Sequence, residues 1–229
     1  QECLPTRSLM YLFLKICDFK NLKIVSLETR PEYVEDWELK AFKNILNPGV
    51  VLEIGIGYET YNPVLRNEIL HKGLSREELV KLMSQLKENG LALKAYIMLK
   101  PHYSLTEEQG IVEAINGLDE LYNLGKEYNV NVSIHLNPTY IAKGCRLTNE
   151  LIEHNYEPPE LTSVIAVLSE ARKRGMYIYT GLDDEGLAIK GGTFRSTGLD
   201  RTKTVKAIQD FNKHQDIDKL FSESGYKYE

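Results

Sequence analysis

The chain has 229 residues, of which 42% are hydrophobic and 27% charged, which suits one sizeable soluble domain with a buried core. Its 33 acidic residues exceed its 28 basic residues, and the net charge of -5 argues against nucleic-acid binding over the whole surface. No secretion-signal pattern opens the chain and no apolar run reaches bilayer-spanning length, so we expect a cytoplasmic protein outside the membrane.

A helix-like stretch, Ser8 to Asp18, comes first. Because the chain opens on Gln1 and enters this helix at once, we expect a fragment of a longer protein. Runs rich in Val, Ile, Leu and Tyr then predict strands at Leu22–Thr29, Val50–Gly57, Leu91–Leu99, Asn131–Asn137 and Met176–Gly181. Apolar residues at three- and four-residue spacing predict helices at Asp36–Leu46, Ser75–Asn89, Glu107–Tyr128 and Leu161–Arg174.

The alternation of strand and helix predicts parallel crossover units, as in a β/α barrel or an open doubly wound sheet. Ser75 with Glu78 forms a capping-box pattern, and Gly90 and Gly175 mark helix ends. We favour an α/β fold: a partial (β/α) barrel of about five parallel strands, truncated at the N-terminus, with a C-terminal loop and helix. The partial TIM-like barrel covers residues 1–183, and residues 184–229 form an extension packed on it.

Side chains alternate between the two faces of a strand, so residue parity sorts them. Leu52, Ile54 and Ile56 define an apolar face that is expected to meet the helices, and the opposite face becomes the lumen. That lumen receives Glu28, Arg30, Glu53, Glu59, Lys94, Lys100, His135 and Asn137. Such charges are costly to bury unless they pair, for example Glu53 with Lys94, or meet a polar ligand. We favour a ligand cavity, with its chemistry at the carboxyl ends of the strands.

Two strand ends carry candidate binding groups. Glu28 suits a hydroxyl or amino group and Arg30 a carboxylate or phosphate, although both also suit structural ion pairs. Gly55 and Gly57 lie inside a strand rather than at the start of a helix, so they do not form a nucleotide-binding loop. The two glycines lie on the same face of the strand, and because they lack side chains they leave room for something lying against the sheet.

Motifs for catalysis or metal binding are lacking. Cys3, Cys17 and Cys145 are widely spaced and are expected to be ordinary reduced thiols. The five histidines show no helical metal-ligand spacing, and only His135, on the polar face, is a candidate for either a catalytic or a structural role. We therefore assign no catalytic residue and no metal site to this chain.

The segment after the last strand is the most basic part of the chain. A helix is predicted from about Asp200 to Phe211. The basic residues here are Arg195, Arg201, Lys203 and Lys206. They suit contact with RNA phosphates, or an ordinary solvated helix.

Four stretches in this order resemble the radical SAM enzymes of the elongator-like type, most closely the archaeosine-biosynthesis radical SAM family. They are Leu27-Glu-Thr-Arg-Pro-Glu32, Leu52-Glu-Ile-Gly-Ile-Gly-Tyr-Glu-Thr60, Arg66 to Gly73, and Lys94-Ala-Tyr-Ile-Met-Leu-Lys-Pro101. The resemblance implies a partial six-unit barrel that holds S-adenosylmethionine in its lumen beside a [4Fe-4S] cluster. Residues 192–216 are also similar, but without the cysteines that relatives often carry there.

The same resemblance implies roles for residues at the strand ends. Glu28 would contact the methionyl or ribose part of the cofactor, and Gly57 and Glu59 would border it. Lys94, Lys100 and Asn137 would face cofactor or substrate. With Arg30 and His135 from the polar face, these are the candidate cofactor-binding residues.

The cluster loop, Cys-x3-Cys-x2-Cys in this superfamily, is absent from the sequence. Counting strands places it upstream of Gln1, so we expect this chain to bind no cofactor itself and to be inactive without its cluster. The parent would modify RNA, such as a tRNA base. The alternatives are a barrel hydrolase or isomerase using Glu28, Glu59 and His135 as acid and base groups, or a non-catalytic small-molecule-binding half-barrel. An exposed barrel edge predicts a homodimer or coverage by the helix at Ser8 to Asp18.

Overall fold

Five parallel strands form one sheet in the computed structural model, which describes residues 5–226 apart from the side chains of residues 146, 147 and 150. The strands are β1 (Ile24–Glu28), β2 (Val51–Glu59), β3 (Ala92–Leu99), β4 (Val132–Pro138) and β5 (Tyr177–Thr180). They lie in the sheet in the order in which they occur along the chain, and all neighbours are parallel. The predicted α/β fold with a partial barrel of five parallel strands is confirmed.

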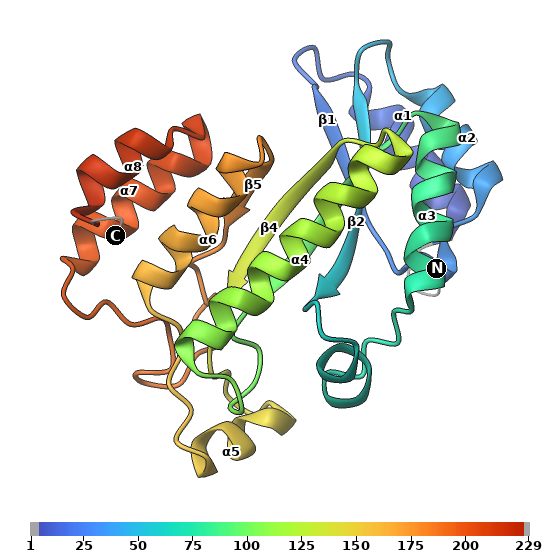
Figure 1. The fold of residues 1–229 in the computed structure, drawn as a ribbon. Helices are drawn as coiled ribbons and strands as arrows, with labels where there is room; N and C mark the ends of the chain where they lie inside the picture. Colours follow the sequence, from blue (N-terminus) through green and yellow to red (C-terminus); the bar gives the residue numbers. More distant parts are fainter. Residues whose placement is uncertain (1–4, 227–229) are drawn as a thin grey trace.

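Helices before, between and after the strands cover one side of the sheet, apart from the short helix after β4, which lies beyond the carboxyl ends of the strands (Figure 1). They are α1 (Thr6–Ile16), α2 (Asp36–Ile45), α3 (Arg76–Asn89), α4 (Glu107–Tyr128), α5 (Arg146–Glu153), α6 (Leu161–Lys173), α7 (Arg201–His214) and α8 (Ile217–Ser224). A 3₁₀ turn at Pro31–Tyr33 and a π-helix at Leu65–Ile69 complete the set. The predicted helices are all present, whereas α5, α8 and the π-helix carry too short a pattern to be predicted from periodicity.

Local signals set the helix boundaries. The Ser75 hydroxyl accepts the Glu78 N–H at 3.1 Å while the Glu78 carboxylate accepts the Ser75 N–H at 2.7 Å, so the predicted capping box starts α3. Gly90 ends α3 in the left-handed conformation at φ 59°, which a residue without a Cβ adopts at no steric cost.

The two faces of the sheet divide as parity predicts. Leu93, Ile97 and Ile134 are fully buried under the helices, and they belong to the main core of the protein. The other face carries no helical layer, and its side chains are partly or fully exposed from Glu28 on β1 to Tyr179 on β5. Among the described residues, helices therefore cover one face of the sheet, and the other face, called the open face below, is exposed.

The first helix packs on α2 rather than covering the edge of β1, which corrects one of the two expectations for that edge. The rings of Phe13 and Phe42 stack with centroids 4.6 Å apart, and the Asn47 amide donates to the Cys17 carbonyl at 2.9 Å. The reason is that the apolar stripe of α1 centres on Phe13, which finds its burial on the neighbouring helix.

At the opposite end of the sheet, α7 and α8 pack side by side, with α7 against β5 and α8 against α6 (Figure 1). Ile208 and Phe211 of α7 join the same core as the sheet. No helix in the described part of the chain is long and apolar enough to cross a membrane.

Candidate functional site

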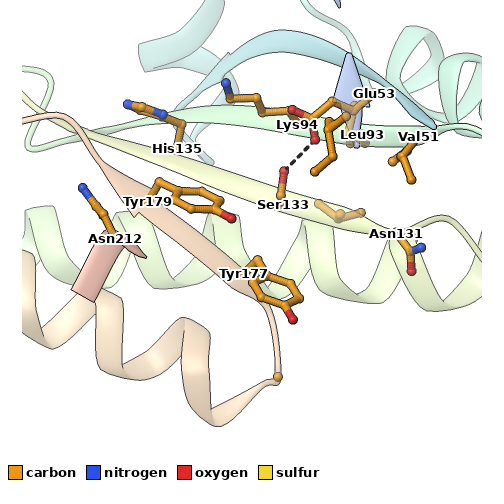
Figure 2. Close-up of a pocket in the computed structure, with 14 residues that line it drawn as sticks. Val51, Glu53, Leu93, Lys94, Asn131, Ser133, His135, Tyr177, Tyr179 and Asn212 are labelled. Atoms are coloured by element: carbon orange, nitrogen blue, oxygen red, sulfur yellow. Dashed lines mark hydrogen bonds between the residues drawn. The ribbon is translucent and has the colours of Figure 1, made fainter. Parts of the chain in front are cut away.

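A cavity of about 920 Å³ lies on the open face of the sheet. It runs over the starts and middles of all five strands and is bordered by Asn212 of α7 (Figure 2). Lys94, Ser133, His135, Tyr177 and Tyr179 line its floor. The size suits a nucleoside-sized ligand. It reaches the middle of the strands, whereas the sequence interpretation placed the chemistry at their carboxyl ends.

An aromatic row crosses the middle of this face. The strand register aligns Gly57 with Tyr96, Tyr96 with His135, and His135 with Tyr179. The Tyr96 and His135 rings lie 5.1 Å apart at an angle of 39°. Three residues with rings therefore lie side by side at one level of the sheet, where another planar group can stack on a ring.

Glu28 and Lys94 both interact with Tyr96 of this row. The Tyr96 hydroxyl donates to the Glu28 carboxylate, and the Lys94 ammonium lies 5.0 Å from the centre of the Tyr96 ring. Burial, then the bond to Glu28, raises the pKa of the Tyr96 hydroxyl, and Lys94 opposes the rise. The structure thus brings two predicted site residues together around a tyrosine that parity placed on this face.

The alternative Glu53–Lys94 ion pair is not formed between these two described residues. The register sets Lys94 beside Gly55 rather than Glu53, and Glu53 instead accepts a hydrogen bond from the Ser133 hydroxyl at 3.5 Å. Lys94 keeps its ammonium over the open face, where a ligand can reach it (Figure 2).

The surroundings of His135 favour its neutral form. Burial lowers its pKa, the neighbouring Lys94 lowers it further, and Glu28 opposes the shift. A neutral imidazole donates from one nitrogen and accepts at the other, which suits hydrogen bonding to a polar ligand.

A second cluster forms at the carboxyl end of β2. Lys72 pairs with Glu59 at 2.8 Å, and both side chains lie over Gly57, where any Cβ would collide with them. The glycines were predicted to leave room for something against the sheet. In this structure the chain's own side chains occupy that room. Lys72 and Glu59 lie over Gly57, and the Cγ of Glu28 lies 3.0 Å from where a Cβ on Gly55 would be.

Lys72 is the site residue that parity missed, because it lies in a loop and not on a strand. Its backbone is fixed by an Arg30 guanidinium that donates to its carbonyl at 2.8 Å and by its own N–H, which donates to the Arg66 carbonyl at 2.9 Å. Left-handed residues flank it, His71 at φ 52° and Gly73 at φ 66°. One signal in the sequence was the His-Lys-Gly phrase at the end of the Arg66 to Gly73 stretch. In the structure this phrase follows the π-helix and contains left-handed backbone, and both features are frequent at functional sites.

Arg30 itself is exposed and pairs with Glu32 at 2.6 Å. Arg30 is therefore a paired charge in this structure and also fixes the backbone of Lys72, while its predicted contact with a carboxylate or phosphate stays a prediction. Asn137, at the end of β4, lies close to Gly181, its Oδ1 3.4 Å from where a Cβ on that glycine would be.

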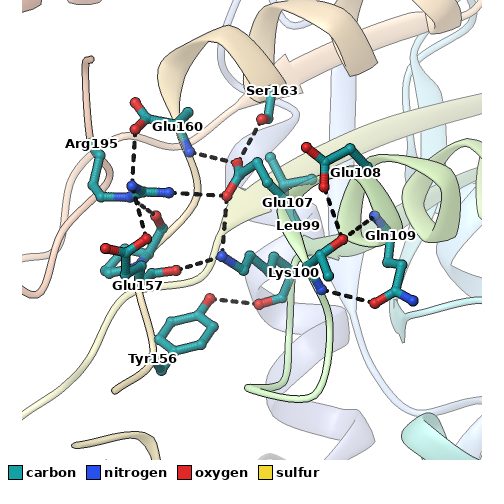
Figure 3. Close-up of polar contacts among 12 residues, drawn as sticks. Leu99, Lys100, Glu107, Glu108, Gln109, Tyr156, Glu157, Glu160, Ser163 and Arg195 are labelled. Atoms are coloured by element: carbon teal, nitrogen blue, oxygen red, sulfur yellow. Dashed lines mark hydrogen bonds and ion pairs between the residues drawn. The ribbon is translucent and has the colours of Figure 1, made fainter. Parts of the chain in front are cut away.

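Lys100 does not join the open face, which corrects the parity prediction. Its ammonium pairs with Glu107 at 3.1 Å and donates to the Glu157 carbonyl at 2.8 Å, and the residue is only 6% exposed (Figure 3). Lys100 follows the last residue of β3 at φ 55°, so the alternation of the strand no longer applies and its side chain turns toward α4.

The described thiols do not suit an iron–sulfur cluster. Cys17 donates to the Ile45 carbonyl at 3.2 Å between α1 and α2, whereas Cys145 is exposed beyond β4; Cys3 lies outside the described residues. Within residues 5–226, no group of three or more His, Cys, Asp or Glu side chains is placed to hold a metal ion. A cluster would need ligands from elsewhere.

Arg195 and Arg201 of the basic tail make contacts with other groups of the chain. Arg195 pairs with Glu107, Glu157 and Glu160 at 3.0 to 3.3 Å, and the Arg201 guanidinium lies 4.2 Å from the Phe194 ring centre. Lys203 and Lys206 of α7 remain exposed. The basic surface is smaller than the sequence indicates.

Comparison with known proteins reveals archaeal relatives. The chain is 28% identical over 217 residues to an uncharacterized protein of Methanocaldococcus jannaschii, covering 94% of this chain and 57% of that protein. It is 30% identical over 168 residues to archaeosine synthase subunit beta of Methanosarcina acetivorans, covering 73% of this chain and 46% of that protein. The chain spans about half the length of these relatives. No family model matches the sequence.

Among solved structures, Elp3 of Methanocaldococcus infernus with an N-terminal deletion superposes with a TM-score of 0.58 over 91% of this chain and 46% of that one. At 18% sequence identity, this likeness shows the shared fold. The homology to archaeosine synthase subunit beta supports the radical SAM-like relationship that the sequence motifs predict.

Proposed function

We propose that this chain forms the cofactor-holding part of a radical SAM enzyme that modifies tRNA or other RNA. One observation carries the proposal: three motif stretches that resemble this family place Glu28, Gly57, Glu59, Lys94 and Tyr96 on a single open sheet face. Homology to archaeosine synthase subunit beta supports RNA as the substrate class.

The open face offers groups that match the chemistry of S-adenosylmethionine. The aromatic row of Tyr96, His135 and Tyr179 provides a surface for the adenine ring. The Lys72–Glu59 pair presents one cation and one anion side by side, which complements the carboxylate and ammonium of the methionyl part. Glu28 suits a ribose hydroxyl.

Of the remaining candidates, Arg30 positions Lys72, while Lys94 and Asn137 face the region where cofactor and substrate would meet. The buried Lys100 supports the end of β3 from behind. When bound, the cofactor and its cluster supply the radical chemistry; the residues of this chain bind, orient and shield. Because the described thiols do not suit the cluster, we propose that it belongs to another part of the intact protein and that this chain alone is inactive.

Calorimetric titration with S-adenosylmethionine tests the proposal on this chain and on the intact protein. Binding should require the intact protein, and Glu59→Gln should weaken it at least about tenfold, the loss expected for a charge-assisted contact. Glu77→Gln, at an exposed position in the first turn of α3, is the matched control and should bind like wild type. Failure of both forms to bind would contradict the proposal.

We propose that RNA contacts Lys203 and Lys206, two exposed lysines of α7. Replacing both by Glu should weaken RNA binding and flatten its dependence on salt, because fewer counterions are released. An unchanged salt slope in filter binding would place the RNA surface elsewhere.

A further inference from the structure

Three aromatic rings stack beyond the carboxyl end of β3, outside the cavity on the open face. The centre of the Tyr103 ring lies 4.0 Å from that of His102 and 3.9 Å from that of His154, with angles of 35° and 13° between the ring planes. His102 and Tyr103 follow β3, whereas His154 follows α5, so the stack joins two loops that are far apart in the sequence. None of these rings belongs to the site proposed for the cofactor.

The stack is held in place by packing and is reached by solvent at one of its rings. Tyr103 packs against a small hydrophobic cluster that contains Leu151 of α5 and Tyr156. His102 is only 8% exposed, whereas His154 is exposed. The rings are therefore ordered before any ligand arrives, and His154 presents ring surface on which a planar group can stack.

A pocket of about 290 Å³ opens beside Tyr103 and His154. This volume lies at the lower end of the range for ligand sites and suits one planar ring system. Lys100 and Asn155 in its lining have left-handed backbone, at φ 55° and 51°, a conformation that is uncommon outside glycine and gathers at functional sites. The Tyr156 hydroxyl donates to the Lys100 carbonyl at 2.6 Å, which ties the pocket to the end of β3 (Figure 3).

The polar groups of the pocket suit the edge of a base better than a phosphate. The lining contains one ammonium, that of Lys100, and it is already paired with Glu107. The Asn155 amide, in contrast, forms no hydrogen bond within the described part of the chain, and neither does the Tyr103 hydroxyl. An amide both donates and accepts, so it can bond two neighbouring groups on the edge of a base.

We propose that this pocket takes one unpaired base of the RNA substrate, which stacks on the Tyr103–His154 rings while the Asn155 amide bonds its edge. The inference rests on the proposed function, in which the substrate is RNA. Proteins recognise single-stranded RNA in this way, with bases stacked on Tyr or His rings and bonded at their edges. The base would be held at the carboxyl ends of the strands, the side of a barrel that receives substrates.

Fluorescence titration of the intact protein with a short single-stranded RNA tests this. The probe is a uridine oligomer with one central 2-aminopurine, whose emission changes when the base stacks, and titration at about pH 8 keeps imidazole charge out of the comparison. His154→Ala should weaken binding about tenfold or more, the loss expected for one stacked base, whereas His154→Phe keeps a ring and should retain most of the affinity. Tyr11→Ala removes a 60% exposed ring from α1 as the matched control and should bind like wild type.

Wild-type affinity in His154→Ala would overturn the proposal. Equal losses in His154→Ala and His154→Phe would also overturn it, because they would assign the contact to an imidazole nitrogen. Stacking releases no counterions, so His154→Ala should keep the wild-type dependence on salt, and a flatter dependence would show a phosphate contact instead.

The outcome is separable from that of the proposed function. An intact protein that binds S-adenosylmethionine but not this RNA would overturn the base pocket and leave the cofactor site standing. The opposite result, ring-dependent RNA binding without S-adenosylmethionine binding, would support the base pocket and contradict the cofactor site.

Discussion

Two lysine–glutamate pairs stand at the ends of neighbouring strands, and they have opposite surroundings. Lys72 and Glu59 lie on the open face, with side chains 26% and 19% exposed. Lys100 and Glu107 lie behind the sheet, where Glu107 also accepts bonds from the Ser163 hydroxyl at 2.6 Å and the Glu160 N–H at 2.8 Å. The same type of ion pair is tied into a network of buried groups in one place and is partly exposed on the open face in the other.

The largest effect is expected at the buried pair. Lys100→Met keeps the length of the side chain but leaves Glu107 and the Glu157 carbonyl without their ammonium partner. Removing one member of a buried pair typically costs about 3 kcal/mol or more, which urea unfolding would measure. A loss below about 1 kcal/mol would show that Arg195 alone can satisfy Glu107.

Glu107 also predicts a pH dependence of stability. Burial raises its pKa, but the bonds from Ser163, Glu160 and Lys100 outweigh burial and lower it below the usual value of 4.5. A carboxylate with a depressed pKa stabilises the fold fully above its unfolded pKa, and this contribution is lost as pH falls through the folded pKa. Glu107→Gln should therefore lower stability at neutral pH and reduce the slope below about pH 4.5. An unchanged slope would contradict the assignment.

Gly110 next to Lys100 and Gly57 next to Lys72 allow a matched comparison, with a smaller expected effect on stability. A Cβ on Gly110 would lie 2.9 Å from the Lys100 Cβ and 3.2 Å from its Cα, whereas a Cβ on Gly57 would meet only the mobile tips of Lys72 and Glu59. Gly110→Ala should cost about 1 kcal/mol after the gain in helix propensity, because backbone cannot move aside. Gly57→Ala should fold normally and lose ligand affinity in the intact protein. Equal losses of thermal stability in the two variants would contradict this difference between Gly110 and Gly57.

Lys72→Met should have the smallest effect on stability. A partly exposed ion pair contributes about 0.5 kcal/mol, and the loop keeps its backbone bonds to Arg30 and Arg66. Binding of S-adenosylmethionine by the intact protein should nevertheless fall at least about tenfold, the share of one charge-assisted contact. Normal affinity in this variant would make Lys72 a loop anchor only.

Parity explains what could be predicted from the sequence. The alternation of Leu52, Ile54 and Ile56 with glycines and charges identified the open face and most of its residues, since a strand has a fixed period. It failed at Lys100, where a left-handed residue ends the strand, and at Lys72, which no strand positions. The hydrogen bonds from the backbone of β5 to the Asn212 and Gln215 side chains were also beyond reach, because they join α7 and its C-cap to a strand more than thirty residues earlier.

Anaerobic iron–sulfur reconstitution of this chain, beside the intact protein, tests the central claim most directly. The claim is that the open face is the cofactor side of a site whose cluster side lies outside this chain. We predict a stoichiometric [4Fe-4S] absorbance in the intact protein and none in this chain. A stoichiometric cluster bound by this chain alone would contradict the account.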